Sequence, residues 1–355
     1  MVADVSLPPA PERTFASDNF SAAHPRYLDA IARANQGHAP AYGADAWSAE
    51  ATRLFRELCD EDVEVLFTFG GTGSNIVALA SLLGPAESII CTRWSHINVD
   101  ETGAPERLLG AKLQDVESDD ARVHPHHIEN LAHALGNVHH AQPGVVSITQ
   151  ATELGTLYSA DHVRAVCEAA HARGMKVHLD GARIANAVAA SGGTPETFRQ
   201  LTFGAGVDAV SFGGTKNGMF GAEAVLLRRS TSSNRATYLR KQNTQLPSKM
   251  RYVAAQFVEA LTDGLWLETA GHANAMAAHL HDSLSDLTSL RLSPPDVNSL
   301  YPVLGAEEKS RLQEWCFFWD WDPVTSQVRW MTSWDTSAED VERFAAGVRL
   351  VVTPD

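Results

Sequence analysis

Short apolar runs alternate with amphipathic stretches along the chain as far as Arg228. Within the stretches, apolar residues recur every three or four positions, as Tyr27, Leu28 and Ile31 do, which is the spacing of one helix face. The runs are short and rich in β-branched residues, which is typical of buried strands. Strands that alternate with helices predict an α/β fold, with a mostly parallel central sheet and helices on both faces. The predicted strands are 63–69, 88–92, 144–149, 176–180, 207–213 and 223–228, and the predicted helices include 46–59, 75–83 and 160–173.

The strand pattern fades after Arg228, and a different organisation follows. A long amphipathic helix is predicted from about 252 to 287, then an aromatic segment, and a last helix over 338–350. These features predict a small C-terminal α+β domain. The first residues are rich in proline and predict an arm that becomes ordered only by packing against another part of the protein. The expected division is an N-terminal arm (1–22), a large domain (23–248) and a small domain (249–355).

The charge and cysteine content exclude several classes of function. The chain has 355 residues, with 28 Lys and Arg against 43 Asp and Glu, and a net charge of −15. Proteins that bind nucleic acids or anionic membranes need a basic face, so neither partner is expected. The four cysteines lie far apart, and the N-terminus lacks the basic and apolar regions of a secretory signal. A cytoplasmic location is therefore expected.

A glycine-rich segment, Phe69-Gly70-Gly71-Thr72-Gly73-Ser74-Asn75, lies between a predicted strand and a predicted helix. Glycine lets the backbone approach an anion closely, and the free N–H groups of a helix start attract negative charge. Gly71 and Thr72 are therefore candidates for binding a phosphate group. The segment matches neither the dinucleotide fingerprint nor a Walker loop, and a flexible strand-to-helix turn would explain it as well.

Two charged residues follow predicted strands. Asp180, within HLDGAR (178–183), ends a strand expected to be buried, where it could hold a protonated heterocyclic nitrogen, pair with Arg183 or cap the next helix. Lys216, within SFGGTKNG (211–218), could be a desolvated amine nucleophile or an exposed loop tip. A phosphate cradle, a strand-end aspartate and a strand-end lysine together match the needs of pyridoxal 5′-phosphate (PLP): an anion cup, a carboxylate for the ring nitrogen and an amine for the aldehyde.

Seven sequence elements extend this pattern over nearly the whole chain: Ser17-Asp18-Asn19, 41–45 (AYGAD), Gly71-Thr72 with Asn75, His96 with 101–104 (ETGA), 179–183 (LDGAR), 215–218 (TKNG) and Arg329. In this order they are similar to the threonine aldolase family of fold-type-I PLP enzymes, within the β-eliminating lyase group. The resemblance implies an aminotransferase-like fold and reversible cleavage of β-hydroxy-α-amino acids, such as threonine, allo-threonine and phenylserine, to glycine and an aldehyde. The chain departs from the commoner family pattern at Asn19, where Thr is usual, and in 213–218 (GGTKNG), where Ser-Lys-Gly-Leu is more frequent. Both departures concern the preferred substrate side chain.

The resemblance also implies roles for the residues that would hold the cofactor. Lys216 would be the catalytic lysine that binds PLP covalently, and Asp180 would bind the pyridine nitrogen. Gly71 and Thr72 would hold the phosphate. Arg251 resembles a family arginine that assists at the phosphate from a partner subunit, which implies a homodimer or homotetramer with sites at the dimer interface.

Further residues would act on the substrate. His96 would stack on the cofactor ring and lie near the substrate hydroxyl, with His139 (or the adjacent His140) as a second histidine nearby. Ser17, Arg183 and Arg329 would bind the substrate carboxylate. Arg329 also stands out on its own, because a guanidinium in an apolar strand is unfavourable without an anion.

Other functions remain open on the sequence alone. A PLP lyase that releases a β-leaving group by elimination could use the same scaffold, and a non-catalytic nucleotide-binding module could use the glycine-rich segment. His124, His126 and His127 lie close together, but Pro125 interrupts them and no metal site is expected. The tryptophans at 315, 319, 321, 330 and 334 are predicted to form the core of the small domain.

Overall fold

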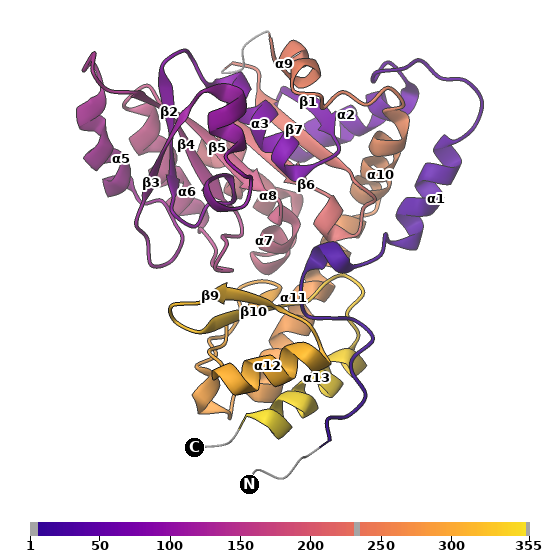
Figure 1. Ribbon diagram of the computed structural model, residues 1–355. Helices are drawn as coiled ribbons and strands as arrows, with labels where there is room; N and C mark the ends of the chain where they lie inside the picture. Colours follow the sequence, from indigo (N-terminus) through magenta and orange to yellow (C-terminus); the bar gives the residue numbers. More distant parts are fainter. Residues whose placement is uncertain (1–5, 231–234, 353–355) are drawn as a thin grey trace.

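The computed structural model describes residues 6–230 and 235–352, and a seven-stranded sheet forms the centre of the large domain (Figure 1). Its strand order is β1-β7-β6-β5-β4-β2-β3; β7 runs antiparallel to both of its neighbours, and every other pair is parallel. The mostly parallel α/β sheet predicted from the sequence is confirmed. The strands are β1 (Val63–Thr68), β2 (Glu87–Thr92), β3 (Lys112–Val116), β4 (Gln142–Thr149), β5 (Lys176–Gly181), β6 (Ala209–Gly213) and β7 (Glu223–Arg228).

The edge strand β3 was not predicted, because its sequence KLQDV is polar and half exposed. An edge strand has a neighbour on one side only and does not need the apolar run that marks the buried strands.

Alternation of side chains along the strands produces two apolar layers. In β7, Ala224 and Leu226 face the core beneath α2 and α10, whereas Val225 and Leu227 face the core beneath α3. The sheet is therefore covered on both faces, as expected for parallel strands. The helices of this domain are α1 (Pro25–Ala34), α2 (Ala46–Cys59), α3 (Gly71–Leu82), α4 (His96–Val99), α5 (Pro125–Leu131), α6 (Ala160–His171), α7 (Ile184–Ala190), α8 (Pro195–Leu201), α9 (Ala236–Gln242) and α10 (Arg251–Thr262).

A second apolar core lies in the C-terminal part. It joins a three-stranded antiparallel sheet of order β8-β10-β9 to three helices, and Trp330, Phe318 and Phe344 pack edge to face at its centre. Trp330 is fully buried as predicted, but Trp319 is 46% exposed, so the tryptophans are only partly core. The elements are α11 (Leu265–Leu284), β8 (Ser299–Leu300), α12 (Ala306–Trp315), β9 (Trp319–Asp322), β10 (Gln327–Met331) and α13 (Ala338–Val351).

The helix predicted over 252–287 is two helices, because Gly264 adopts a positive φ of 72° at the break. The first of them, α10, packs on α1 and α2 in the large domain, although the sequence placed it in the small one. Within α11, residues up to Ala270 belong to the first core and residues from Ala277 to the second. We propose that the domains divide inside α11 and not at 248.

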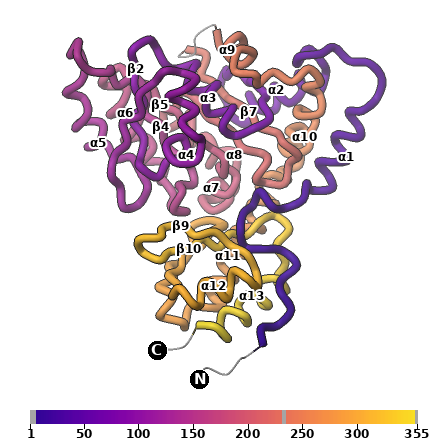
Figure 2. The backbone as a smooth tube through the Cα atoms, viewed as in Figure 1, coloured from indigo at the N-terminus to yellow at the C-terminus, as the bar shows by residue number. Residues whose placement is uncertain are grey.

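The N-terminal arm runs along the small domain (Figure 2). Phe15 stacks on Phe344 with ring centroids 4.2 Å apart, and the backbone N–H groups of Glu12 and Arg13 donate to Asp340 Oδ1 at 3.0 and 3.3 Å. These contacts anchor the arm immediately before Ser17, and so bring the following residues to the space between the two domains.

Candidate active site

A cavity of about 360 Å³ lies where the arm, the large domain and the small domain meet. Parallel strands collect ligands at their carboxyl ends, and this cavity lies at the carboxyl ends of β4 to β6. It is lined by Ser17, Asn19, His96, Asp100, Glu153, Arg183, Lys216, Tyr301, Trp319, Asp320, Trp321 and Arg329.

Lys216 enters this cavity from a short 3-10 helix, Thr215–Asn217, that follows β6. Gly213 makes that turn possible: a Cβ there would lie 2.5 Å from the backbone oxygen of Ala182. Among the described residues, the Lys216 amine has no hydrogen-bond or ion-pair partner. Burial lowers the pKa of Lys216, and the positive charge of Arg183 lowers it further. The amine is therefore easier to deprotonate than an exposed lysine, as a nucleophile requires.

Asp180 lies at the end of β5, paired in register with Ser211 of the neighbouring strand that leads to Lys216. Its side chain accepts hydrogen bonds from Asn75 Nδ2 at 2.8 Å and from the backbone N–H of Ala182 at 3.0 Å. Burial opposes ionisation, but the charges of His96, His178 and Lys216 outweigh it and lower the pKa of Asp180. The carboxylate is therefore ionised and able to pair with a protonated ring nitrogen.

The glycine-rich segment starts α3 four residues earlier than predicted, at Gly71 instead of Asn75. Gly70 is the N-cap and supplies no side-chain acceptor, so the first-turn N–H groups of Gly71 and Thr72 are without a partner in the helix. A Cβ placed on Gly70 or on Gly71 would have no other atom within 4 Å, so the space beside these residues is open. A helix start with free N–H groups and open space can bind a phosphate.

His96, at the start of α4, connects to Asp180 through a buried hydrogen-bond chain. Its Nδ1 lies 2.9 Å from Glu101 Oε1; that oxygen also accepts from Asn75 Nδ2 at 2.9 Å, and the same amide group binds Asp180. The bond to Glu101 raises the pKa of His96. Glu101 and Asn75 entered the sequence analysis only as parts of motifs, and the structure shows that they orient His96 and Asp180.

Two arginines share the cavity, one from each domain. Arg183 forms a bidentate ion pair with the buried Asp18, at 2.7 and 2.9 Å, and not with Asp180 as one reading of the sequence had it. Arg329 of β10 lies with its guanidinium carbon 4.5 Å from the centre of the Trp321 ring, and donates one hydrogen bond to the backbone oxygen of Ala16.

The Nε of Arg329 is buried with no hydrogen-bond partner among the described residues. Burial lowers the pKa of Arg329, and so does the charge of Arg183. Two guanidinium groups facing one cavity, with Ser17 beside them, form a site for a carboxylate.

The structure does not bring His139 into the cavity of its own chain, and its role near the substrate hydroxyl stays a prediction. His139 is exposed in the loop before β4, where its backbone N–H donates to Asn137 Oδ1. The cavity is at the other end of this strand, roughly 25 Å away for eight residues at about 3.3 Å each. The adjacent His140 is exposed in the same loop and is equally remote. The two consecutive histidines match the family pattern in sequence, but both lie outside the cavity of their own chain.

Arg251 also lies outside the cavity of its own chain. At the start of α10, its guanidinium donates to the backbone oxygens of Gln36 and Gly37, at 3.3 and 3.2 Å. Its action at the phosphate of a partner subunit stays a prediction.

The histidine cluster predicted around 124–127 forms a ring stack. His124 and His162 have ring centroids 4.7 Å apart, and His126 and His127 lie 4.0 Å apart. In the part of the chain that the structure describes, no three His, Cys, Asp or Glu side chains group as metal ligands.

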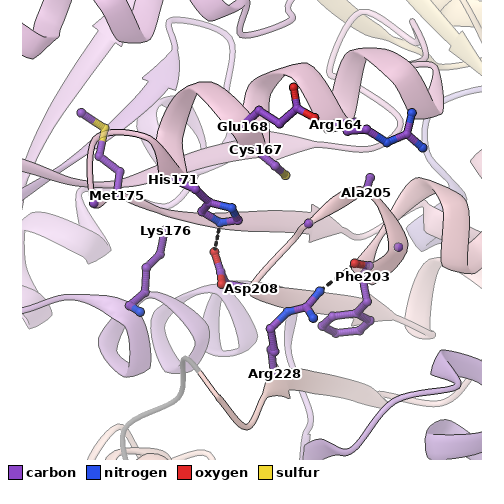
Figure 3. Close-up of a pocket in the computed structure, with 13 residues that line it drawn as sticks. Arg164, Cys167, Glu168, His171, Met175, Lys176, Phe203, Ala205, Asp208 and Arg228 are labelled. Carbon is purple, nitrogen blue, oxygen red and sulfur yellow. Dashed lines mark hydrogen bonds and ion pairs between the residues drawn. The ribbon is translucent and has the colours of Figure 1, made fainter.

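A larger cavity, of about 540 Å³, lies at the opposite end of the strands (Figure 3). Lys176 at the start of β5 lines it, together with His171, which lies 2.9 Å from Asp208, and Arg228, which pairs with Glu61. This cavity is at the opposite end of the sheet from Lys216 and Asp180.

Glu153 is the main residue of the active-site cavity that the sequence analysis missed. It follows β4, whose last residue, Thr149, is paired in register with Asp180. A glutamate at the carboxyl end of a buried strand was the available signal, the same one that identified Asp180.

Comparison with known proteins identifies the family of the chain. The profile of the β-eliminating lyase family matches residues 14–306. A low-specificity L-threonine aldolase of Pseudomonas aeruginosa is 40% identical over 342 residues, which are 95% of this chain and 97% of that protein. The structure of a Leishmania major threonine aldolase superposes with a TM-score of 0.88 at 30% identity, covering 98% of this chain and all of that one.

A structure of SPT with a PLP internal aldimine has a TM-score of 0.66 and covers 95% of this chain and 87% of that one; at 15% identity it shows the fold alone. None of the described helices is long and apolar enough to cross a bilayer. The family match over most of the chain and the similar relatives lead to one conclusion: the chain belongs to the β-eliminating lyase family, in its threonine aldolase branch.

Proposed function

We propose that this chain is a PLP-dependent aldolase that cleaves β-hydroxy-α-amino acids of the threonine, allo-threonine and phenylserine type to glycine and an aldehyde. The relatives from Pseudomonas aeruginosa and Leishmania major are threonine aldolases. The observation that carries the proposal is the meeting of the Lys216 amine and the Asp180 carboxylate at the ends of adjacent strands. Each shifts the pKa of the other, so they lie within electrostatic reach of one another.

The donor set fits PLP. An unpartnered buried amine (Lys216) would take the aldehyde carbon, an ionised buried carboxylate (Asp180) the ring nitrogen, and the open start of α3 at Gly71 and Thr72 the phosphate. When bound, PLP supplies an electron sink for the pair released from a bond to the substrate Cα. Asp180 sustains that sink by keeping a positive charge favourable at the ring nitrogen.

The remaining residues position the substrate. Arg183 and Arg329 would bind the α-carboxylate from two sides, with Ser17 adjacent, and would thereby fix the orientation of the substrate Cα. His96 would lie over the ring, held in orientation by Glu101. A carboxylate clamp next to the lysine favours α-amino acids over simple aldehydes or nucleotides as substrates.

The protein would act as a cytoplasmic homodimer or homotetramer. Phe69 and Phe220 are 46% and 69% exposed, and the position of a Cβ on the adjoining Gly221 lies 3.9 Å from the Phe69 backbone oxygen, so the surface around these two backbone segments exposes large apolar side chains. Such a surface is a candidate subunit contact, and it lies next to the turn that carries Lys216.

The test is to add PLP to the purified protein, record the absorbance of the lysine-bound cofactor, and supply L-threonine, L-allo-threonine and phenylserine. Glycine and an aldehyde are expected; pyruvate or another keto acid with ammonia would indicate the elimination reaction instead. A protein that binds nucleotides and develops no such absorbance would support the non-catalytic alternative. Lys216→Ala should lose both the absorbance and aldehyde release, whereas retention of both would remove Lys216 from the mechanism.

A further inference from the structure

Glu153 has a buried carboxyl group inside the active-site cavity, and it neither holds the cofactor nor binds the substrate carboxylate in the function proposed above. The segment that follows β4 carries it back to the carboxyl end of the sheet, beside the Asp180 strand. Its position is fixed from both domains: the hydroxyl of Tyr301, a residue just after β8, donates to the Glu153 backbone oxygen at 2.8 Å. Glu153 is thus held at the point where the two domains close on the cavity.

The two carboxyl oxygens of Glu153 differ. Oε1 accepts hydrogen bonds from the His96 backbone N–H at 2.8 Å and from Thr149 Oγ1 at 2.9 Å. Oε2 is buried and has no hydrogen-bond partner among the described residues. One oxygen therefore orients the group and the other is available, which is the arrangement of a carboxyl group that exchanges a proton.

His96 is the other proton acceptor in the cavity, but its position suits a different task. Its Nδ1 is bound to Glu101, a contact that raises the pKa of the ring. This contact orients the ring and leaves Nδ1 engaged by Glu101. Of the other cavity carboxylates, Asp100 and Asp320 are exposed, and His139 lies at the far end of β4. Glu153 alone among them is buried with a free oxygen.

We propose that Glu153 is the catalytic base that accepts the proton of the substrate β-hydroxyl group, a role that rests on the aldol cleavage proposed above. As the O–H proton passes to Oε2, the hydroxyl oxygen forms a C=O bond and the Cα–Cβ bond breaks. The electron pair of that bond stays with the glycine fragment. The proton gained by Glu153 is released to solvent, and Cα takes up a solvent proton in a separate step, so that no other reactant is consumed.

The surroundings of Glu153 tune it for this exchange near neutral pH. Burial raises the pKa of Glu153 to about 7, and the negative charge of Asp180 contributes in the same direction. A base whose pKa lies near the working pH is partly unprotonated and still has a sufficient affinity for the proton that it takes. The titratable groups around it are His96 from α4, Asp180 from β5, Cys91 from β2, and Tyr158 and Tyr301 from the loops after β4 and β8.

Glu153→Gln tests the role, because glutamine keeps the size and the Oε1 acceptor but cannot take the proton. Cleavage of phenylserine by the PLP-loaded variant should fall by roughly 10²–10⁴-fold, and the rise of kcat/KM with pH near 7 should disappear. Exchange of the glycine α-proton with deuterated solvent should stay within about threefold of wild type, since glycine has no β-hydroxyl group. Glu314→Gln, the same change at an exposed position of α12, is the matched control.

A readout independent of turnover follows the carboxyl group itself. In protein labelled at glutamate carboxyl carbons, with and without PLP, NMR should show a signal that titrates near pH 7 and is missing from Glu153→Gln. Glu223, whose pKa burial also raises to about 7, should give a second signal that Glu223→Gln removes instead.

Three results would overturn the role of Glu153: a Gln variant that cleaves phenylserine at the wild-type rate, a joint loss of cleavage and glycine exchange, or Glu153→Asp being less active than Glu153→Gln. The joint loss would mark Glu153 as structural. Absence of cleavage in the wild-type protein would instead refute the proposed function on which the role depends.

Discussion

Replacing Asp18 by Asn tests how the carboxylate site is built. Asp18 is 1% exposed and binds Arg183 through two parallel hydrogen bonds of 2.7 and 2.9 Å, and Asn298 donates to the same carboxylate at 3.3 Å. The charge of Arg183 lowers the pKa of Asp18 despite the opposing effect of burial, so the pair is ionic. The amide can accept one hydrogen bond from Arg183, but its NH₂ group opposes the second.

Breaking a buried ion pair on one side costs about 3–5 kcal/mol. Because the Arg183 side chain is 15% exposed and can recruit water, we expect the lower part of this range, about 3 kcal/mol, in the free energy of unfolding. The displaced guanidinium should also reduce kcat/KM for phenylserine by about 10²-fold, the loss typical of a misplaced positioning group. The loss should be much smaller for the phenylserine amide, which has no carboxylate to hold.

Urea unfolding and steady-state kinetics measure the two effects. Asp161→Asn is the matched control, since it removes a carboxylate that is 92% exposed and paired with Arg164; its unfolding free energy should change by less than about 0.5 kcal/mol. An Asp18→Asn protein that keeps both wild-type stability and wild-type kcat/KM for the acid would refute the reasoning. Equal losses for the acid and its amide would show that Asp18 supports the fold and not the carboxylate site.

Further predictions concern the turn at Lys216, a buried histidine and the second arginine. Gly213→Ala should destabilise the protein by about 1–3 kcal/mol, because the new Cβ would lie 2.5 Å from the Ala182 backbone oxygen. Gly271→Ala is the control: a Cβ there meets open space in α11, and the substitution should stabilise the protein by about 0.5–1 kcal/mol. Urea unfolding measures both changes. Burial lowers the pKa of His178 to about 4, so the folded protein binds this proton less readily than the unfolded chain. The free energy of unfolding should therefore be unaffected by this histidine above about pH 6.5 and should fall by about 3 kcal/mol as the pH decreases to 4. His178→Asn should flatten this pH dependence. Arg329→Gln should lower kcat/KM for phenylserine roughly 10–10²-fold, mostly through KM, with little effect on its amide.

Site residues at the carboxyl ends of strands could be predicted from the sequence. Asp180 and Lys216 each follow a buried apolar run, and parallel strands place such ends together, so their proximity could be predicted without coordinates. His139 precedes β4 and therefore lies at the amino end of its strand, outside the cavity of its own chain. The same strand polarity would have drawn attention to Glu153, which follows β4.

Contacts between distant parts of the chain could not be predicted from the sequence. Asp18 and Arg183 are 165 residues apart, and nothing local in either segment indicates the other. The break of the long helix at Gly264 was also missed, because a single glycine inside an amphipathic pattern is tolerated unless its φ is positive, which only the fold determines. Pairing partners and backbone angles are set by packing, and an apolar pattern does not encode them.

The charges of the cavity show why a substrate carboxylate would bind between the two domains. Arg183, from the large domain, already has Asp18 as a counterion, whereas Arg329, from the small domain, has a buried Nε with no partner among the described residues and a pKa lowered by burial. A substrate carboxylate would supply the charge that Arg329 lacks, and would bind both arginines at once only when the domains hold β10 against the arm. The free energy of that ion pair is therefore available to hold the substrate beside the lysine. A substrate without a carboxylate would forgo the ion pair, and would lose affinity.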